Sequence, residues 1–262
     1  TDRQMNFPGL RMGNNLPAVG VLQHLLVRGG KDVGIDGDFG SGTQGALEKY
    51  QETNGLWKRG HTDPFTWEHL TYGKSFPILD VVDIFDENLY EMEATDIKGI
   101  LGKRIVVDGM DNGVEYAVTK ILSAVKNPLF LLRFHGHGAP GEAGVADGKG
   151  ADFDHSAFTT RDMDHIRPLL MKLRGIFGPY GCVQFMHCST GRGRKGIRLL
   201  KAIADELKVP VSAALRTQKG GKAKTFFYEG ATHTQIPDGK TIGSWTRSLP
   251  RMPFSPTYYF FP

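Results

Sequence analysis

Hydrophobic positions divide the chain into two parts with different spacing. Up to about residue 75, apolar residues recur at helical spacing, and Gly-rich turns interrupt each run. The pattern predicts helices over 16–26, 43–54 and 64–72, with Gly29-Gly30 ending the first of them. Together they form a three-helix unit that is small but able to bury a core.

Beyond residue 75, short apolar runs of strand length alternate with runs at helical spacing. We predict strands over 78–84, 103–107, 129–134, 183–186 and 209–214. We predict helices over 114–125, 163–177, with Pro168 in the first turn, and 197–207. This alternation favours an α/β fold with a mostly parallel sheet covered by helices on both faces. The predicted domains are therefore a three-helix domain over 1–75 and an α/β domain over 76–262.

The composition of the 262 residues is that of a globular protein, with 40% hydrophobic and 23% charged residues. No apolar run reaches 18 residues, so no membrane span is predicted. Two cysteines cannot form a disulfide framework. The chain starts at Thr1 without the features of a signal peptide, which leaves a removed leader, another export route and a cytoplasmic location all open.

The net charge of +4 lies entirely in the second part of the chain. Residues 1–75 hold 8 basic and 8 acidic residues, whereas residues 192–251 hold 13 basic and 4 acidic residues. Such a stretch is typical of a solvated basic face, or of attraction for an acidic substrate or a phosphate-rich polymer. The interleaved aromatic residues of an RNA-binding sheet are missing, so no nucleic-acid partner is predicted.

The N-terminal part carries an ordered set of motifs. They are Leu22-Gln23, Ile35-Asp-Gly-Asp-Phe-Gly40, Thr43, Tyr50-Gln51, Asn54-Gly-Leu56, Gly60 and Thr66-Trp67. Over residues 10–73 this set resembles the peptidoglycan-binding domain of many cell-wall hydrolases, with Asp38 in place of the usual aliphatic residue. The resemblance implies peptidoglycan as a partner and attachment to a bacterial wall. Most of the motif residues are expected to shape turns and core rather than to contact sugar.

Two predicted strands of the second part end in reactive side chains beside Gly-rich turns. The first end is Phe134-His-Gly-His-Gly-Ala-Pro-Gly141, and the second is Phe185-Met-His-Cys-Ser-Thr-Gly191. Neighbouring parallel strands would bring both turns to the same edge of the sheet. A thiol and an imidazole at that edge could form a dyad, in which the thiolate attacks a carbonyl carbon and the imidazole protonates the leaving amine.

The two strand-end motifs and their order resemble the caspase-like cysteine peptidases, a group that includes legumains, metacaspases and clostripain. The resemblance covers residues 78–216, with His187 as a departure before the cysteine. It implies that His137 is the general acid/base, that Cys188 is the nucleophile, and that the N–H groups of Gly138 and Cys188 hold the oxyanion. It also implies a specificity pocket near Arg216, whose guanidinium would favour an acidic side chain or a carboxylate.

Three other side chains near these motifs receive separate predictions. His135, two residues before His137, is a second candidate for substrate contact. Cys182 and His187 are expected to be structural, the latter because an extended backbone would turn it away from Cys188.

The leading hypothesis is a wall-targeted cysteine hydrolase that needs no cofactor or metal. Its substrate would be an amide bond in an envelope protein or in the peptide part of peptidoglycan, and it would act as a secreted or envelope-located protein. A secreted antibacterial effector, or toxin, held in check by an immunity protein is one form of this hypothesis.

Two alternatives remain open from the sequence. In a metal-dependent wall hydrolase, His135-x-His137 would bind zinc with Cys188 or His155 as a further ligand. In a non-catalytic wall-binding or scaffold protein, the second domain would only bind a partner.

Overall fold

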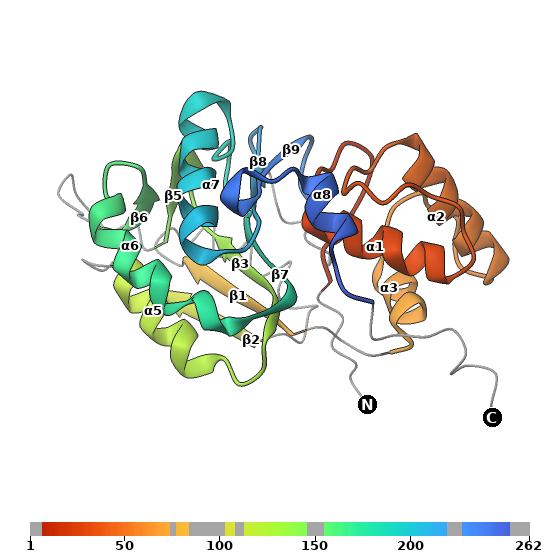
Figure 1. The fold of residues 1–262 in the computed structure, drawn as a ribbon, viewed down its shortest axis with the longest axis horizontal. Coiled ribbons are helices and arrows are strands. Elements are labelled where there is room, and N and C mark those ends of the chain that lie inside the picture. The colour runs from red at the N-terminus through yellow and green to blue at the C-terminus, as the bar shows by residue number, and fades with distance from the viewer. Residues whose placement is uncertain are drawn as a thin grey trace.

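The computed structural model describes residues 7–73, 77–83, 103–107, 113–145, 155–218 and 227–251. Its N-terminal part contains α1 (Pro17–Arg28), α2 (Ser41–Thr53) and α3 (Pro64–Thr71), which confirms the three predicted helices (Figure 1). Pro17 and Pro64 lie in first turns, where a missing N–H leaves no helical hydrogen bond unmade. The Asp63 carboxylate caps α3 by accepting the Thr66 N–H at 2.7 Å.

Two buried glutamines hold the loops between these helices. The amide oxygen of Gln23 accepts the N–H groups of Asp36 and Gly37, and its nitrogen donates to the Asp36 carboxylate at 2.7 Å. Gln51 accepts the N–H groups of Arg59 and Gly60 in the same way. Both glutamines belong to the motifs of the sequence, and their role here is to shape turns, as expected.

A six-stranded sheet forms the centre of the molecule. Its order is β2 (Lys103–Val107), β1 (Ile78–Asp83), β3 (Leu129–His135), β7 (Phe177–Phe185), β8 (Val211–Ala214) and β9 (Thr232–Gln235). All neighbouring strands are parallel except β8 and β9. The prediction of a mostly parallel sheet is thus confirmed, and the order 2-1-3-4-5 of the parallel strands is one of the common doubly wound orders.

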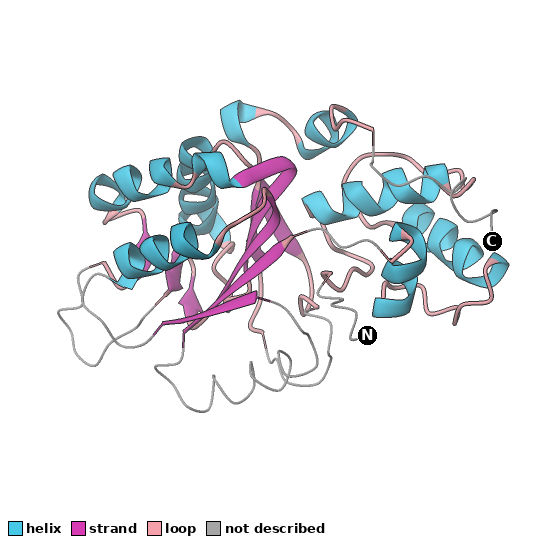
Figure 2. Ribbon diagram, turned by 90° about the horizontal axis from the view of Figure 1, so that it is seen from below, coloured by secondary structure: helices cyan, strands magenta, loops and turns pink. Residues whose placement is uncertain are grey.

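One face of the sheet packs on α5 (Gly113–Ala124), α6 (Met163–Lys172) and α7 (Gly193–Leu207) (Figures 1 and 2). The predicted helix over 163–177 was too long, because a short 3₁₀ turn, Arg174–Ile176, follows α6 and β7 begins at Phe177. Pro168 lies inside α6 rather than in its first turn. A proline there removes only one backbone hydrogen bond, and the buried Ile166, Leu169 and Leu170 hold this short helix on the core.

The other face of the sheet packs on the N-terminal part, whose helix α1 lies against β7, and α8 (Ile242–Arg247) packs in turn on α1 (Figures 1 and 2). One continuous core joins Leu22 and Leu26 of α1 to sheet residues that include Leu131 and Cys182. Gly20 of α1 permits close approach to α8, since a Cβ at this position would lie 2.3 Å from a methyl carbon of Thr246. The sheet therefore has helices on both faces, but the N-terminal part supplies most of the second layer.

The predicted boundary at residue 75 falls between α3 and β1, in a stretch outside the described residues. The shared core means that the two predicted domains pack as neighbours with apolar contact between them. None of the helices in the described part of the chain has the length and hydropathy needed to cross a membrane.

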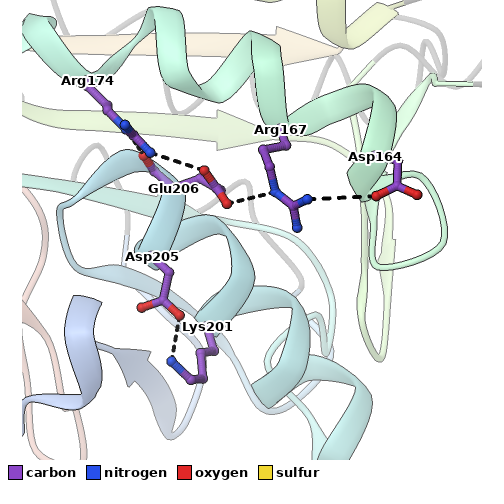
Figure 3. A network of polar contacts seen from close by, with 6 residues as sticks. All are labelled: Asp164, Arg167, Arg174, Lys201, Asp205 and Glu206. Carbon is purple, nitrogen blue, oxygen red and sulfur yellow. Dashed lines mark hydrogen bonds and ion pairs between the residues drawn. The ribbon is translucent and has the colours of Figure 1, made fainter.

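Charged side chains link α6, the 3₁₀ turn and α7 on the outer surface (Figure 3). Glu206 pairs with Arg167 at 2.8 Å and with Arg174 at 3.1 Å, and Arg167 also approaches Asp164 at 3.8 Å. Glu206 is the shared partner, so it connects elements that are far apart in the chain.

Candidate active site

The two strand-end motifs lie side by side in the structure. β3 and β7 are adjacent and parallel, with Phe134 opposite Phe185, so the segments that follow them leave the sheet at the same edge. After β3 the chain forms a small antiparallel sheet of β4 (Gly138–Ala139), β5 (Glu142–Gly144) and β6 (Ala157–Thr159). After β7 it passes through residues 186–192 into α7.

Hydrogen bonds connect these two segments directly. The Thr190 hydroxyl donates to the carbonyl oxygen of Glu142 at 2.6 Å, and the Gly141 N–H donates to the Thr190 carbonyl at 3.1 Å. The backbone at Gly138 touches the cysteine turn, since a Cβ there would lie 2.6 Å from the His187 Cβ and 3.0 Å from the Cys188 carbonyl oxygen. Only glycine fits at this contact, which brings the backbone of the histidine turn against that of the cysteine turn.

Cys188 lies at the surface end of β7, partly exposed, and its sulfur contacts a third segment. The Gln218 N–H donates to Sγ at 3.2 Å, and Sγ lies 3.4 Å from the Gln218 carbonyl oxygen. Ser189 follows in a left-handed conformation with φ of 55°, which is uncommon for a residue other than glycine. Its N–H donates to the Arg216 carbonyl at 2.9 Å, so the extension of β8 supports the strained turn.

His137 is exposed, and its carbonyl oxygen accepts the Gly144 N–H at 2.8 Å. The turn that carries this imidazole is therefore fixed by the small sheet on one side and by the cysteine turn on the other. The histidine and cysteine turns, and with them Gly138, are thus brought to one edge of the sheet, as the sequence predicted.

His187 is fully buried and packs its ring against Phe185, in agreement with the expected structural role. Burial lowers the pKa of His187 to about 3, although its hydrogen bond to the Gly144 carbonyl at 2.6 Å acts in the opposite direction. The ring is therefore neutral near pH 7 and donates from Nε2 to that carbonyl. Gly136 passes against this ring, where a Cβ would lie 3.0 Å from Nε2.

Arg216 is exposed just beyond β8, at the same edge as Cys188. Its aliphatic stem lies along Gly230, where a Cβ would be 3.3 Å from its Cδ.

Gln218 is a residue that sequence reasoning missed. Its side chain accepts the Glu229 N–H at 2.7 Å and donates to the Arg216 carbonyl at 3.0 Å, while its backbone meets Sγ. No pattern in the sequence marks it, because its contact with Cys188 joins residues 30 positions apart.

His135 does not join this group on the surface. It is 1% exposed, and its Nε2 lies 2.8 Å from Asp80 Oδ1 on the sheet face that the N-terminal helices cover. Arg133 forms a two-point contact with the same carboxylate at 2.7 and 3.1 Å. Burial by itself would raise the pKa of Asp80, but Arg133 and His135 hold it at about 2.

These charges belong to a polar row that crosses five adjacent strands in register. Its members are Asp80, Arg133, Gln184, Ser212 and Thr234. All but Thr234 are buried, and Ser212 shares a hydrogen bond of 2.8 Å with Thr234. The Thr234 hydroxyl then donates to the carbonyl of Asn15 in the N-terminal part. The row therefore runs from the buried ion pair to the contact with the N-terminal helices, and no sequence prediction included it.

Cys182 lies within β7, is fully buried and is placed 3.5 Å from the Phe130 carbonyl oxygen. Burial raises the pKa of its thiol well above the ordinary value, which disfavours the reactive thiolate and fits the expected structural role. Among the described residues, no group of three or more His, Cys, Asp or Glu side chains is arranged to hold a metal ion.

Comparison with known proteins identifies the N-terminal part alone. Residues 15–70 match the family described as "Putative peptidoglycan binding domain", which agrees with the resemblance in the sequence and indicates association with a cell wall. No curated protein matches the chain.

Among solved structures, the chain is similar to prephenate dehydrogenase from A. aeolicus in complex with hydroxyphenyl propionate and NAD+, at 12% identity. The match covers 66% of this chain and 58% of that one, with a TM-score of 0.32. At that score the likeness supports no argument about fold or activity.

Proposed function

We propose that this protein is a wall-associated cysteine hydrolase that cleaves an amide bond with Cys188 as nucleophile and His137 as general acid/base. The observation that carries the proposal is the contact between the Gly138 backbone and the 187–190 turn at the ends of two adjacent parallel strands. The caspase-like resemblance of the sequence is supported by the strand order of the sheet and by the histidine turn preceding the cysteine turn along the chain. Glycines also lie beside both His137 and Cys188 in these turns.

In the proposed reaction, His137 takes the proton of the Cys188 thiol, and the thiolate attacks the carbonyl carbon of the scissile amide. The N–H groups of Gly138 and Cys188 stabilise the negative charge that develops on the carbonyl oxygen. The C–N bond then breaks, and His137 gives its proton to the leaving nitrogen, which leaves the acyl group on sulfur as a thioester. Water attacks the thioester while His137 takes one of its protons. The C–S bond then breaks, the carboxylic acid is released, and His137 returns the proton to the sulfur.

The Gln218 N–H orients the sulfur before substrate arrives, because it donates to Sγ from a segment that its own side chain holds in place. Ser189 supports the same arrangement, since its left-handed conformation makes the turn after the nucleophile sharp. These contacts favour one position of the sulfur at the edge of the sheet.

The substrate is an envelope protein or the peptide part of peptidoglycan, and the match of residues 15–70 supports the wall as the place of action. Arg216 lies exposed beside the cysteine turn and favours a substrate with a carboxylate or an acidic side chain near the scissile bond. A secreted effector with an immunity protein as inhibitor is one setting that fits these properties.

Cleavage of purified sacculi and of a library of soluble peptides tests the proposal. Cys188→Ala and His137→Ala are each expected to lower the turnover rate at least about 100-fold, in the range for loss of a nucleophile or general base. His61→Ala, at a histidine of the N-terminal part, is the matched control and is expected to retain cleavage of the soluble peptides. Full activity of Cys188→Ala would refute the cysteine mechanism.

Alkylation provides an independent measurement. Iodoacetamide is expected to label Cys188 and to leave Cys182 unmodified in the folded protein, because Cys182 is fully buried. Loss of activity should follow labelling of Cys188 and be insensitive to a chelator. Inhibition by the chelator alone would favour the metal-dependent alternative instead.

A further inference from the structure

The N-terminal part has an open cavity whose aromatic residues, Trp57 and Phe65, lie outside the motifs of the sequence. It has a volume of about 310 Å³ and is lined by Gly55, Leu56, Trp57, Asp63 and Phe65. These residues come from the loop after α2 and from the start of α3. The volume is at the lower end of the range for small-molecule sites, which are concave and largely apolar with a few polar groups.

Two aromatic side chains at this cavity are left in solvent. Trp57 is 73% exposed and Phe65 is 70% exposed, more than any other large hydrophobic residue among those described. Neither belongs to a core cluster, whereas Trp67, ten residues after Trp57, is almost fully buried. Large exposed apolar groups that gather around a cavity indicate a binding surface, since single exposed residues are usually scattered.

The loop that carries Trp57 is held in one conformation. The Arg59 guanidinium lies over the Trp57 ring, 4.5 Å from its centroid, and Arg59 also pairs with the Asp63 carboxylate at 3.5 Å. Gln51 accepts the N–H groups of Arg59 and Gly60 and donates to the carbonyl oxygen of His61 at 2.9 Å. A surface fixed in this way loses little conformational entropy when a ligand binds.

We infer that this cavity binds the glycan strand of peptidoglycan, with Trp57 and Phe65 as stacking surfaces for its N-acetylated sugar rings. The C–H groups on one side of a pyranose ring are apolar and pack on an aromatic face, while its hydroxyl and acetamido groups reach outward to polar partners. Arg59 and Asp63 place such partners beside Trp57. The whole cavity lies within residues 15–70, the segment that matches the peptidoglycan-binding family.

The glycan is favoured over the stem peptide because of the charges around the cavity. Arg59 and Asp63 neutralise each other, and Asp63 also caps α3 through the Thr66 N–H. The cavity therefore offers aromatic surface without an unbalanced charge, which suits an uncharged sugar ring better than a stem peptide with free carboxylates.

Sedimentation of the full-length protein with purified sacculi tests this inference. Trp57→Ala is expected to weaken binding at least tenfold, and the double variant Trp57→Ala/Phe65→Ala is expected to abolish it. Trp57→Phe, which retains an aromatic face, should bind within about threefold of the unaltered protein. Val27→Ala removes another exposed apolar side chain of the same part of the chain, away from the cavity, and should have no effect.

Competition with soluble fragments identifies the ligand. A tetramer of N-acetylglucosamine should displace the protein from sacculi and change the fluorescence of Trp57, whereas a free stem pentapeptide should do neither. Displacement by the pentapeptide alone, or normal binding of the double variant, would overturn the inference. Unchanged thermal unfolding of the variants shows that they are folded, which is expected because both side chains are exposed.

The inference is independent of the proposed hydrolase. Binding is measured without cleavage, so loss of activity in Cys188→Ala leaves the result unaffected. Conversely, Trp57→Ala should retain cleavage of a soluble peptide while losing attachment to sacculi, and the two proposals can therefore fail separately.

Discussion

The sheet face that packs on α5, α6 and α7 is lined by aliphatic and aromatic side chains, whereas the face toward the N-terminal helices also carries the polar row. On the first face, residues such as Leu132 and Val183 meet helices that follow in the same α/β pattern. On the second face, Asp80 and Arg133 are buried beneath a layer that the N-terminal part largely supplies.

This difference indicates which contacts fix the position of the N-terminal helices on the sheet. Apolar contact is non-directional and tolerates small shifts. The ion pair and hydrogen bonds of the polar row are directional, and at its end Thr232 and Thr234 bond to the backbone of Asn15. We therefore expect the row to fix one position of the N-terminal helices on the sheet.

The largest effect is expected from separating the buried ion pair. Arg133→Met should lower the free energy of unfolding by about 3–5 kcal/mol, because it leaves the Asp80 carboxylate buried without its strongest partner. Urea unfolding measures this change. The double variant Asp80→Leu/Arg133→Met should recover much of the loss, since it removes both charges.

The neighbouring residue provides the comparison with the apolar face. Leu132→Ala should cost about 2–5 kcal/mol through a cavity, and no second substitution of a charged residue should recover it. A loss below 1 kcal/mol in Arg133→Met would show that the ion pair contributes little.

The buried ion pair at Asp80 and the buried ring of His187 beyond the end of β7 should also lose stability in different pH ranges. The folded pKa of Asp80, about 2, lies below its ordinary 3.8, so its contribution of about 2 kcal/mol is present above pH 4 and is lost as the pH falls toward 2. The pKa of His187, about 3, lies below its ordinary 6.5, so stability from this site declines as the pH falls below 6.5. Urea unfolding between pH 2 and 8 measures both.

Single substitutions show which residue causes the loss of stability in each pH range. His187→Gln should flatten the decline that starts near pH 6.5, and Asp80→Asn should flatten the one below pH 4. If the free energy of unfolding of His187→Gln still declines below pH 6.5, the decline does not come from the buried imidazole.

A smaller effect, of opposite sign, is expected at the centre of the polar row. Gln184 is fully buried, and neither amide atom has a hydrogen-bond partner among the described residues. Gln184→Met keeps the volume and removes the unsatisfied amide, so it should raise the free energy of unfolding by about 1 kcal/mol. A loss of more than 1 kcal/mol would instead indicate that buried water satisfies the amide.

The smallest effect is expected at the exposed charges of Figure 3. Glu206→Gln removes the shared partner of Arg167 and Arg174, yet it should cost less than about 1 kcal/mol because solvent screens these pairs. Thermal unfolding at low and high salt measures it, and the difference from the unaltered protein should shrink at high salt. A loss comparable to that of Arg133→Met would remove the distinction between exposed and buried charges.

Much of the fold followed from local patterns. The elements that the sequence predicted lie close to their observed positions, except where α6 gave way early to a longer β7. The short strands β4, β5 and β6, the edge strand β9 and the helix α8 were not predicted. That error arose because Leu173 and Phe177 continue helical spacing while Gly175, Gly178 and Pro179 do not favour a helix, and tertiary pairing with β3 decided the outcome. The cysteine and histidine turns were found because glycines and reactive side chains mark strand ends.

Other parts of the site depended on contacts between distant residues. Gln218 meets Cys188 across 30 positions, and no local pattern indicates such a contact. His135 was grouped with His137 because they lie close in sequence, yet its partner is Asp80, 55 positions earlier. Strand alternation and burial placed the two histidines in different surroundings.

The sequence by itself determined most of the helices and strands and the likeness of the N-terminal part to a peptidoglycan-binding domain, because periodicity and turn residues act over short distances. Only the tertiary structure decided that the N-terminal helices cover one face of the sheet, that a polar row crosses it in register, and that Trp57 and Phe65 gather at a cavity. These features arise from strand register and domain packing, which depend on many weak contacts between residues far apart in the chain.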